Sequence, residues 1–325
     1  MLVAFPLNKN VPLKFFLDSI CEAECETVHI QNLPISSSHT SIPPFLEHVI
    51  PPLQWRGKKT RNALLQKLTI VQRTTWLKAL TFSIANRHLF TIDQSPLLTS
   101  SPHTLVPFLE FNVYWEQENP DLDNIPSPRI FATHMPFNIF HDSIRENDCK
   151  IIYICRNPLD QFVSHIHFSS RNKSGKDADS VSIDDAFDMY CQGINSFRPV
   201  WDHILGYWNT HLENPGKVLF LKYEDLKEDI TSQVKKIAEF MGFPFSLEEE
   251  EQGLIDHITG LCSSESLSNL AVNKTGNING LVKNSSFFRK GQVGDWTNYL
   301  TPPMVERIKM LKDSKFGNSS LMVKT

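Results

Sequence analysis

The sequence predicts a three-layer α/β fold, in which helices cover both faces of a central parallel sheet. Four short apolar runs have the composition of strands, at residues 68–71, 129–133, 150–155 and 218–223, and each precedes a helical or loop segment. Parallel strands need such crossover segments, and strands buried on both faces consist of nearly continuous apolar residues. The 325 residues, 41% hydrophobic and 21% charged, are sufficient to bury one large core of this kind.

The helices between these strands follow from apolar spacing and from helix start signals. Residues 75–88 carry Leu77, Leu80 and Ile84 on one face, so we expect these three side chains in the core. Pro158 is a favourable first helical residue after the third strand. Further amphipathic helices are expected at 230–241 and 247–258, and Pro302 and Pro303 open the last helix.

The middle of the chain combines another helix with two expected loops. Ser182, followed three residues later by Asp185, favours a helix start for 183–193 with Phe187, Cys191 and Ile194 facing inward. Residues 169–182 are rich in Ser, Lys, Asp and Gly, which is typical of a mobile loop. Residues 273–286 are expected to form a second long loop.

Charge and hydropathy exclude several classes of function. A net charge of −4 argues against a general nucleic-acid binder, so local basic groups must do any anion binding. No apolar run approaches the ~20 residues that span a bilayer, and the N-terminus lacks the pattern of a secretory signal. We therefore expect a cytoplasmic protein with no membrane association. Cys21, Cys25 and His29 share helical spacing suited to a metal, but an ordinary acidic helix is the simpler interpretation and no metal is expected.

Two runs far apart in the chain have the residues of a phosphate site. In residues 155–164 a strand ends at Arg156, and the helix opened by Pro158 carries Ser164 about two turns later. Residues 287–296 add Arg289, Lys290 and Gly291, which combine a guanidinium, an ammonium and a backbone that a ligand can approach closely. Together these groups indicate recognition of an oxyanion.

With these runs the sequence resembles the plant-type cytosolic sulfotransferases, whose R-x7-S and R-K-G-x2-G-D-W elements hold the 3′-phosphate of PAPS (3′-phosphoadenosine 5′-phosphosulfate). The resemblance extends from Thr74 to Leu300 and includes the runs 74–80, 105–110, 127–137, 221–226 and 267–276 in the family order. It implies a P-loop-like sulfotransferase architecture, with a sulfotransferase domain over 67–325 and a divergent N-terminal segment over 1–66. A P-loop kinase is excluded because no Walker loop is found.

The resemblance also implies the roles of individual residues. His134, in a run that reads Phe131-Ala132-Thr133-His134, corresponds to the general base. The implied cofactor-binding residues are Thr74, Thr75, Trp76, Arg156, Ser164, Tyr223, Cys262, Ser263, Arg289, Lys290 and Gly291.

The chain departs from the family directly before Thr74. The family carries Y-P-K-S-G there, a loop that cradles the 5′-phosphosulfate, whereas this sequence reads Thr69-Ile70-Val71-Gln72-Arg73. Val71 replaces the lysine and Arg73 replaces the glycine. Ser264 also stands where the family usually has an aromatic residue.

The function implied is transfer of a sulfonate group from PAPS to a hydroxyl of a small hydrophobic acceptor, such as a flavonoid, steroid or hormone of plant secondary metabolism. The alternative is a catalytically impaired relative that binds the nucleotide but turns over slowly or not at all. Residues 297–306 lack the lysine and valine of a dimer motif found in some members, so the sequence leaves the oligomeric state open.

Overall fold

The structure, a computed structural model, describes residues 68–72, 75–113, 128–139, 149–171, 182–194, 199–278, 280 and 282–324. The predictions for the segment 1–66, including the Cys21, Cys25 and His29 alternative, lie outside these residues, as do those for Arg73 and Thr74.

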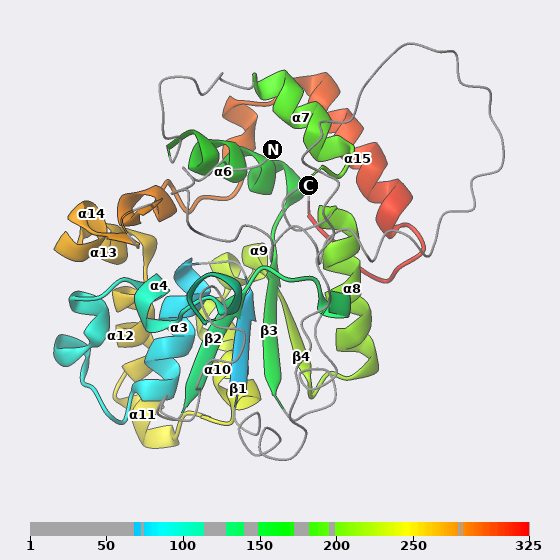
Figure 1. Cartoon of the computed structure of the whole chain (residues 1–325). Helices are drawn as coiled ribbons and strands as arrows, with labels where there is room; N and C mark the ends of the chain where they lie inside the picture. Colours follow the sequence, from blue (N-terminus) through cyan, green and yellow to red (C-terminus); the bar gives the residue numbers. More distant parts are fainter. Residues whose placement is uncertain are drawn as a thin grey trace, which may run out of the picture. The chain divides into compact units, whose positions relative to one another are not determined.

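The central sheet consists of four parallel strands in the order β2-β1-β3-β4 (Figure 1). The strands are β1 (Leu68–Gln72), β2 (Arg129–Thr133), β3 (Lys150–Cys155) and β4 (Val218–Lys222). All four coincide with the predicted apolar runs to within one residue. Gln72 pairs with Thr133 and Cys155 with Lys222, so neighbouring strands end at the same edge of the sheet.

Alternation along the strands divides the core into two halves. In β3, Ile151, Tyr153 and Cys155 belong to one buried cluster, whereas Ile152 and Ile154 belong to the other. Successive strand residues point to opposite faces, so a strand that is apolar throughout must be covered on both sides. The predicted three-layer α/β architecture is confirmed.

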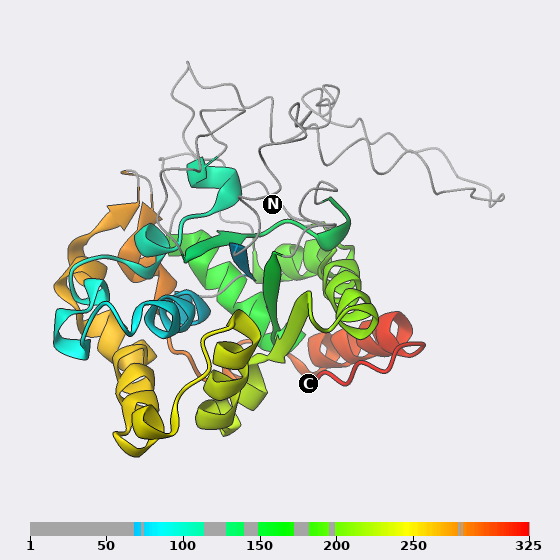
Figure 2. The ribbon, with the colours of Figure 1, turned by 90° about the horizontal axis from the view of Figure 1, so that it is seen from below.

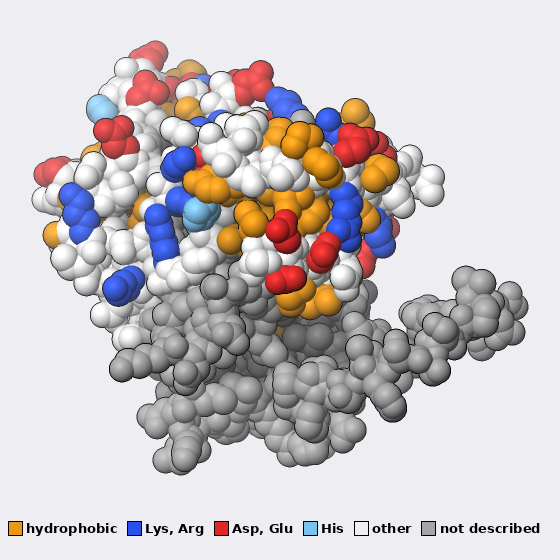
Figure 3. Space-filling model, turned by 90° about the horizontal axis from the view of Figure 1, so that it is seen from above, with side chains coloured by type: hydrophobic (Ala, Val, Ile, Leu, Met, Phe, Trp, Pro, Cys, Tyr) orange, Lys and Arg blue, Asp and Glu red, His pale blue; other side chains and the backbone are white. Residues whose placement is uncertain are grey.

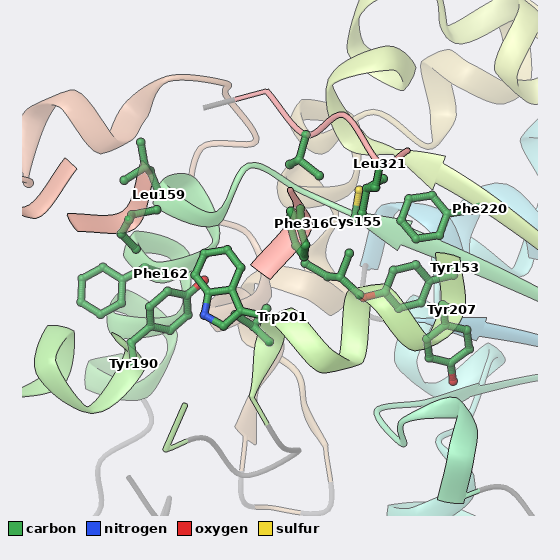
Figure 4. Close-up of a cluster of buried hydrophobic side chains, with 14 of the residues drawn as sticks. Tyr153, Cys155, Leu159, Phe162, Tyr190, Trp201, Tyr207, Phe220, Phe316 and Leu321 are labelled. Atoms are coloured by element: carbon green, nitrogen blue, oxygen red, sulfur yellow. The ribbon is translucent and has the colours of Figure 1, made fainter. Parts of the chain in front are cut away.

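The first half of the core is aromatic and lies against helices α6 (Pro158–Arg171), α7 (Ile183–Cys191), α8 (Val200–Glu213) and α15 (Pro302–Phe316). Figure 4 shows Trp201 of α8 close to Tyr190 and Phe316, with ring centroids 6.3 and 5.5 Å apart. Tyr153 of β3 stacks on Tyr207 of α8 at 4.3 Å. Such ring pairs add to the area that they bury, so this half fixes α8 and α15 on the sheet.

The second half of the core is mainly aliphatic. It packs α3 (Thr75–Asn86), α9 (Tyr223–Glu228), α10 (Ile230–Met241) and α12 (Leu254–Leu261) on the opposite face. Figure 2 shows the yellow helices on one side of the strands and α8 with the red α15 on the other. Leu77, Leu80 and Ile84 are fully buried here, as the spacing along α3 predicts.

Shorter elements complete the described chain. They are η3 (Ile92–Gln94), η4 (Pro96–Leu98), α4 (Pro102–Leu105), η5 (Leu109–Val113), η6 (Phe137–Ile139), α11 (Leu247–Glu251), α13 (Ser264–Asn269), α14 (Ala271–Thr275), β5 (Asn277–Ile278), β6 (Val282–Lys283), η7 (Asn284–Phe287) and η8 (Asp295–Asn298).

Several local predictions need correction. The single helix expected over 247–258 is two helices, because Gly253 adopts a left-handed backbone with φ of 69° between α11 and α12. The expected loop at 273–286 contains the end of α14, the hairpin β5–β6 and most of η7. Ser169, expected in a mobile loop, is buried near the end of α6. Ile194, expected to face inward, is 49% exposed because α7 ends at Cys191.

The other start signals are confirmed. The Ser182 hydroxyl accepts a hydrogen bond from the Asp185 amide at 3.0 Å and caps α7, while Pro158 and Pro302 begin α6 and α15. None of the helices in the described ranges is long and apolar enough to cross a membrane. On the coloured part of the face in Figure 3, acidic and basic side chains lie among one another.

Candidate active site at the carboxyl edge of the sheet

Each of the four parallel strands leads directly into a residue of the expected site. Thr75 opens α3 shortly after β1, His134 follows β2, Arg156 follows β3 and Tyr223 follows β4. The chain leaves β1 toward β2 and leaves β3 toward β4, so the order of connections reverses between the adjacent strands β1 and β3. Open α/β sheets bind ligands at such a switch point, at the carboxyl ends of the strands.

His134 is held by a buried carboxylate. Glu110 of η5 accepts hydrogen bonds from both the His134 backbone amide, at 2.7 Å, and the ring Nδ1, at 2.6 Å, through the same oxygen Oε1. The Glu110 side chain is 3% exposed and that of His134 is 21% exposed. A carboxylate only accepts hydrogen bonds, so Nδ1 carries the ring proton and Nε2 is the basic nitrogen.

Further contacts fix the backbone and the ring plane at this position. The His134 carbonyl accepts a hydrogen bond from Nε2 of His203 on α8 at 3.0 Å. The ring of His134 stacks on Phe108, with centroids 4.4 Å apart. The imidazole is therefore oriented before any substrate arrives, which is the condition for efficient proton transfer.

The two basic runs of the sequence meet in space through Asp160. This fully buried carboxylate on α6 accepts hydrogen bonds from the backbone amides of Gly294, at 2.8 Å, and Trp296, at 3.0 Å. Arg156 adds a hydrogen bond from its guanidinium to the carbonyl of Gln292. Residues 155–164 and 287–296 are thus joined, although more than 120 positions separate them in the chain.

Asp295 holds the two cations of the second run. Its carboxylate accepts from Arg289 on Oδ2 and from the Lys290 ammonium on Oδ1, the latter at 2.7 Å. Burial alone would raise the pKa of Asp295, but the hydrogen bonds from Lys290, Arg289 and Asn298 outweigh it and lower the pKa to about 2. The same carboxylate raises the pKa of Lys290. The carboxylate therefore favours the charged form of Lys290 and holds both basic side chains in place.

Gly291 lies where a side chain would not fit. Its φ is +62°, a left-handed conformation, and a Cβ would come within 3.2 Å of Ser264. The Tyr223 hydroxyl donates to the Gly291 carbonyl at 2.9 Å, and the Arg156 guanidinium lies 4.6 Å from the centre of the Tyr223 ring. Tyr223, Arg156 and Gly291 consequently form one unit at the ends of β3 and β4.

The remaining residues expected to bind the nucleotide differ in burial and in their contacts. Trp76 meets Tyr223 edge to face at 5.6 Å. Ser164 is partly exposed on α6, and Ser263 caps α13 by accepting from the Ser266 amide at 3.0 Å. Cys262 is fully buried, with its sulfur 3.4 Å from the Ser83 hydroxyl, and burial raises the pKa of its thiol to about 12. The Cys262 side chain is thus a core group with no exposed surface.

Lys78 and His103 form a second buried polar pair beside the site. The fully buried Lys78 of α3 donates to the Val106 carbonyl at 2.8 Å and lies 3.2 Å from Nδ1 of His103 on α4. Nε2 of His103 lies 2.9 Å from the Thr75 hydroxyl. The sequence alone assigned no roles to His103, Glu110 or Asp160.

The arrangement can hold an anion beside an oriented base. The Arg156 side chain is 19% exposed, and its guanidinium also lies 3.4 Å from the Asp160 carboxylate, which holds it at this edge. Within the same residues no cluster of three or more His, Cys, Asp or Glu is placed to bind a metal ion.

Comparisons with known proteins agree on one family. The family model described as "Sulfotransferase domain" matches residues 74–320. Cytosolic sulfotransferase 15 of Arabidopsis thaliana is 48% identical over 252 residues, which cover 76% of this chain and 70% of that protein. Flavonol 4′-sulfotransferase of Flaveria chlorifolia is 46% identical over 253 residues, covering 77% of this chain and 78% of that protein.

Solved structures give the same result. A putative steroid sulphotransferase of Arabidopsis thaliana is similar with a TM-score of 0.62 and 34% identity, covering 84% of this chain and 82% of that one. A mouse sulfotransferase complexed with PAP shares the fold with a TM-score of 0.58 at 24% identity, covering 78% of this chain and 85% of that one. On the sequence match and the fold together, this chain is a transferase that belongs to the plant-type cytosolic sulfotransferase family.

Proposed function

We propose that this protein transfers the sulfonate group of PAPS to a hydroxyl of a small hydrophobic acceptor. The observation that carries the proposal is the pairing of His134 with Glu110 at the same sheet edge as the Arg156 and Arg289 cluster. An oriented base next to preorganised cations is what acyl-type and sulfonyl-type transfers to a hydroxyl require.

The described residues fit the nucleotide portion of PAPS. Arg156 contributes a partly exposed guanidinium beside Tyr223, whose hydroxyl holds the Gly291 backbone at the same edge. Ser164, Arg289 and Lys290 complete the proposed 3′-phosphate site, and Trp76 and Tyr223 provide aromatic surface for the adenine. Thr75 begins a twelve-residue helix, whose N-terminus suits the 5′-phosphate. When bound, PAPS supplies an activated sulfonate; no metal is needed in this proposal.

His134 performs the proton transfer in this scheme. Glu110 keeps the ring proton on Nδ1, so Nε2 takes the proton of the acceptor hydroxyl as that oxygen becomes a nucleophile. The imidazolium that forms is stabilised by the buried carboxylate 2.6 Å away. This is the same division of labour as in other histidine bases oriented by a carboxylate.

The acceptor class is proposed from the relatives. One of them is named for a flavonol and another for a steroid, which supports a phenolic or alicyclic hydroxyl on an apolar scaffold. The relatives that are named cytosolic support a cytoplasmic location. The alternative of an impaired enzyme rests on Val71 and Arg73, whose side chains lie outside the described residues.

The test is sulfonate transfer from PAPS to a panel of flavonols and hydroxysteroids, with product detected by mass spectrometry. Wild type should form sulfated product, and His134→Ala should abolish turnover while the affinity for adenosine 3′,5′-bisphosphate (PAP) changes less than about twofold. Failure of wild type to bind this nucleotide, or equal losses of turnover and affinity in His134→Ala, would contradict the proposal.

A further inference from the structure

Two buried polar side chains, Lys78 and His103, and the half-buried Thr75 form a continuous chain of hydrogen bonds that ends at the proposed 5′-phosphate site. Lys78 Nζ lies 3.2 Å from His103 Nδ1, and His103 Nε2 lies 2.9 Å from Thr75 Oγ1. Thr75 and Lys78 lie three residues apart on α3 and so share a face, while α4 supplies His103 between them. None of these contacts involves the His134 and Glu110 pair.

The position of Lys78 is unusual for a lysine. Its side chain is fully buried, the ammonium lies 3.3 Å from the centre of the Phe108 ring, and it donates to the Val106 carbonyl. Within the described residues no carboxylate forms an ion pair with it at 4.0 Å or less. Burying an amine with no carboxylate in direct contact costs free energy, so the retention of Lys78 calls for a role.

The chemistry of the three groups favours one direction for these hydrogen bonds. Burial lowers the pKa of Lys78 well below its usual value, with the charge of Glu110 acting in the opposite direction. An ammonium has only donors, and a neutral amine still has two N–H groups, one for the Val106 carbonyl and one for Nδ1 of His103, so Nε2 carries the ring proton. Nε2 then donates to Thr75 Oγ1, and the Thr75 hydroxyl turns its own hydrogen away from His103. Burial, together with the charge of Lys78, holds the pKa of His103 well below its usual value, in agreement with a neutral ring.

We propose that Lys78 and His103 are positioning residues that commit the Thr75 hydroxyl to donate its hydrogen to the 5′-phosphate of the nucleotide. This inference rests on the proposed function, because it takes the PAPS 5′-phosphate as the acceptor at Thr75. Without the hydrogen bonds from Lys78 and His103, the Thr75 hydroxyl could equally donate to the imidazole. Its oxygen lone pairs would then face the phosphate and repel it. Hydrogen bonds in series also polarise one another, so the N–H donated by Lys78 strengthens Thr75 as a donor.

The His103 ring is held in place by its own packing. It stacks on Phe287 of η7 at 3.8 Å and on Phe108 at 5.6 Å. The closer contact, with Phe287, does not involve Lys78, so replacing Lys78 by the similarly shaped methionine should leave the ring where it is. This separation makes the role of the Lys78 amine testable.

The first experiment reads the tautomer without any nucleotide. Long-range proton–nitrogen NMR on histidine-labelled protein should show His103 neutral with its proton on Nε2, assigned by comparison with His103→Gln. A proton on Nδ1, or on both nitrogens, would overturn the inference. Because this readout needs no ligand, it stands even if the protein proves not to use PAPS.

The second experiment is a double-mutant cycle measured by calorimetric titration with PAP. Lys78→Met should weaken binding about tenfold in the wild-type background, and this effect should fall below about twofold in Thr75→Val, because the Thr75 hydroxyl is then gone. Equal effects in both backgrounds would mean that Lys78 acts by another route and would overturn the inference.

Two controls separate positioning from folding. His103→Gln keeps an N–H that can reach Thr75 and should bind PAP within about threefold of wild type, whereas His103→Leu should lose about tenfold. Adenosine 3′-monophosphate, which lacks the 5′-phosphate, should bind Lys78→Met and wild type alike. Weakened binding of this ligand, or equal losses in the two His103 variants, would show a merely structural role. Absence of binding of both nucleotides to wild type would instead contradict the proposed function.

Discussion

Replacing Glu110 should produce a graded loss of turnover that follows from its two hydrogen bonds. Both N–H groups of His134 donate to the same oxygen, Oε1, so Glu110→Gln can keep a carbonyl oxygen at that place and preserve the tautomer. What it loses is the charge that stabilises the imidazolium. The difference between a charge-assisted and a neutral hydrogen bond is about 1–2 kcal/mol, which corresponds to roughly a 5- to 30-fold lower kcat.

Glu110→Leu removes the acceptor as well as the charge. The ring then loses the acceptor that holds its proton on Nδ1, and the half-buried backbone amide of His134 loses its acceptor too. Loss of the correct tautomer in serine proteases lowers turnover about 10⁴-fold, so we expect a decrease on the order of 10³-fold or more here. Since the hydrogen bonds of Glu110 within the described residues go to His134 and not to the proposed phosphate site, PAP affinity should stay within about twofold in both variants.

The assay is single-turnover sulfonate transfer to one responsive acceptor, with calorimetry for nucleotide affinity. Thermal unfolding identifies variants that remain folded, because the Gln side chain places an amide where the buried Oε2 has no hydrogen-bond partner among the described residues. Wild-type turnover in Glu110→Gln and Glu110→Leu alike would refute the orienting role of this carboxylate. A drop in nucleotide affinity as large as the drop in turnover would do the same.

Three further predictions concern the phosphate residues and the loop before them. Arg289→Ala should weaken PAP binding by about 1.5–3 kcal/mol in calorimetry, whereas the control Arg307→Ala, whose partner is the exposed Asp188, should not; equal affinities would remove Arg289 from the site. Asp295→Asn should lower the free energy of unfolding by about 1–2 kcal/mol at pH 7 in urea titrations. The pKa of Asp295 in the folded state is lowered from 3.8 to about 2, so this stabilisation is present above about pH 4 and is lost toward pH 2. The difference in free energy of unfolding between wild type and Asp295→Asn should therefore decrease over that interval. A difference that stays constant would contradict this prediction. Rebuilding residues 69–73 as Tyr-Pro-Lys-Ser-Gly should raise turnover at least about a hundredfold, because Val71 cannot neutralise charge on the departing oxygen. A wild-type rate of ~1 s⁻¹ or more would contradict this prediction and would mean that Arg73 or Lys78 has taken over the role of the missing lysine.

The strands and most of the helix starts could be predicted from local sequence because their causes are local. An apolar run such as 150–155 is buried on both faces whichever neighbours it has, and Ser182 caps its helix through an amide three residues away. The prediction of one helix over 247–258 was wrong because apolar spacing continued across Gly253, where the backbone turns left-handed. Periodicity does not record such a break.

The sequence by itself determined the fold class, the family and the residues that follow each strand, His134, Arg156 and Tyr223 among them. Only the tertiary structure decided which groups act on those residues. Glu110 lies 24 positions from His134, and Asp160 lies 134 from Gly294, so no spacing rule connects them. The direction of the hydrogen bonds from Lys78 through His103 to Thr75 likewise depends on the packing of α4 against α3, which brings these three side chains together. Which group donates and which accepts depends on the side chains that lie next to each other in space. In a parallel sheet with long crossovers, such side chains are far apart in the sequence.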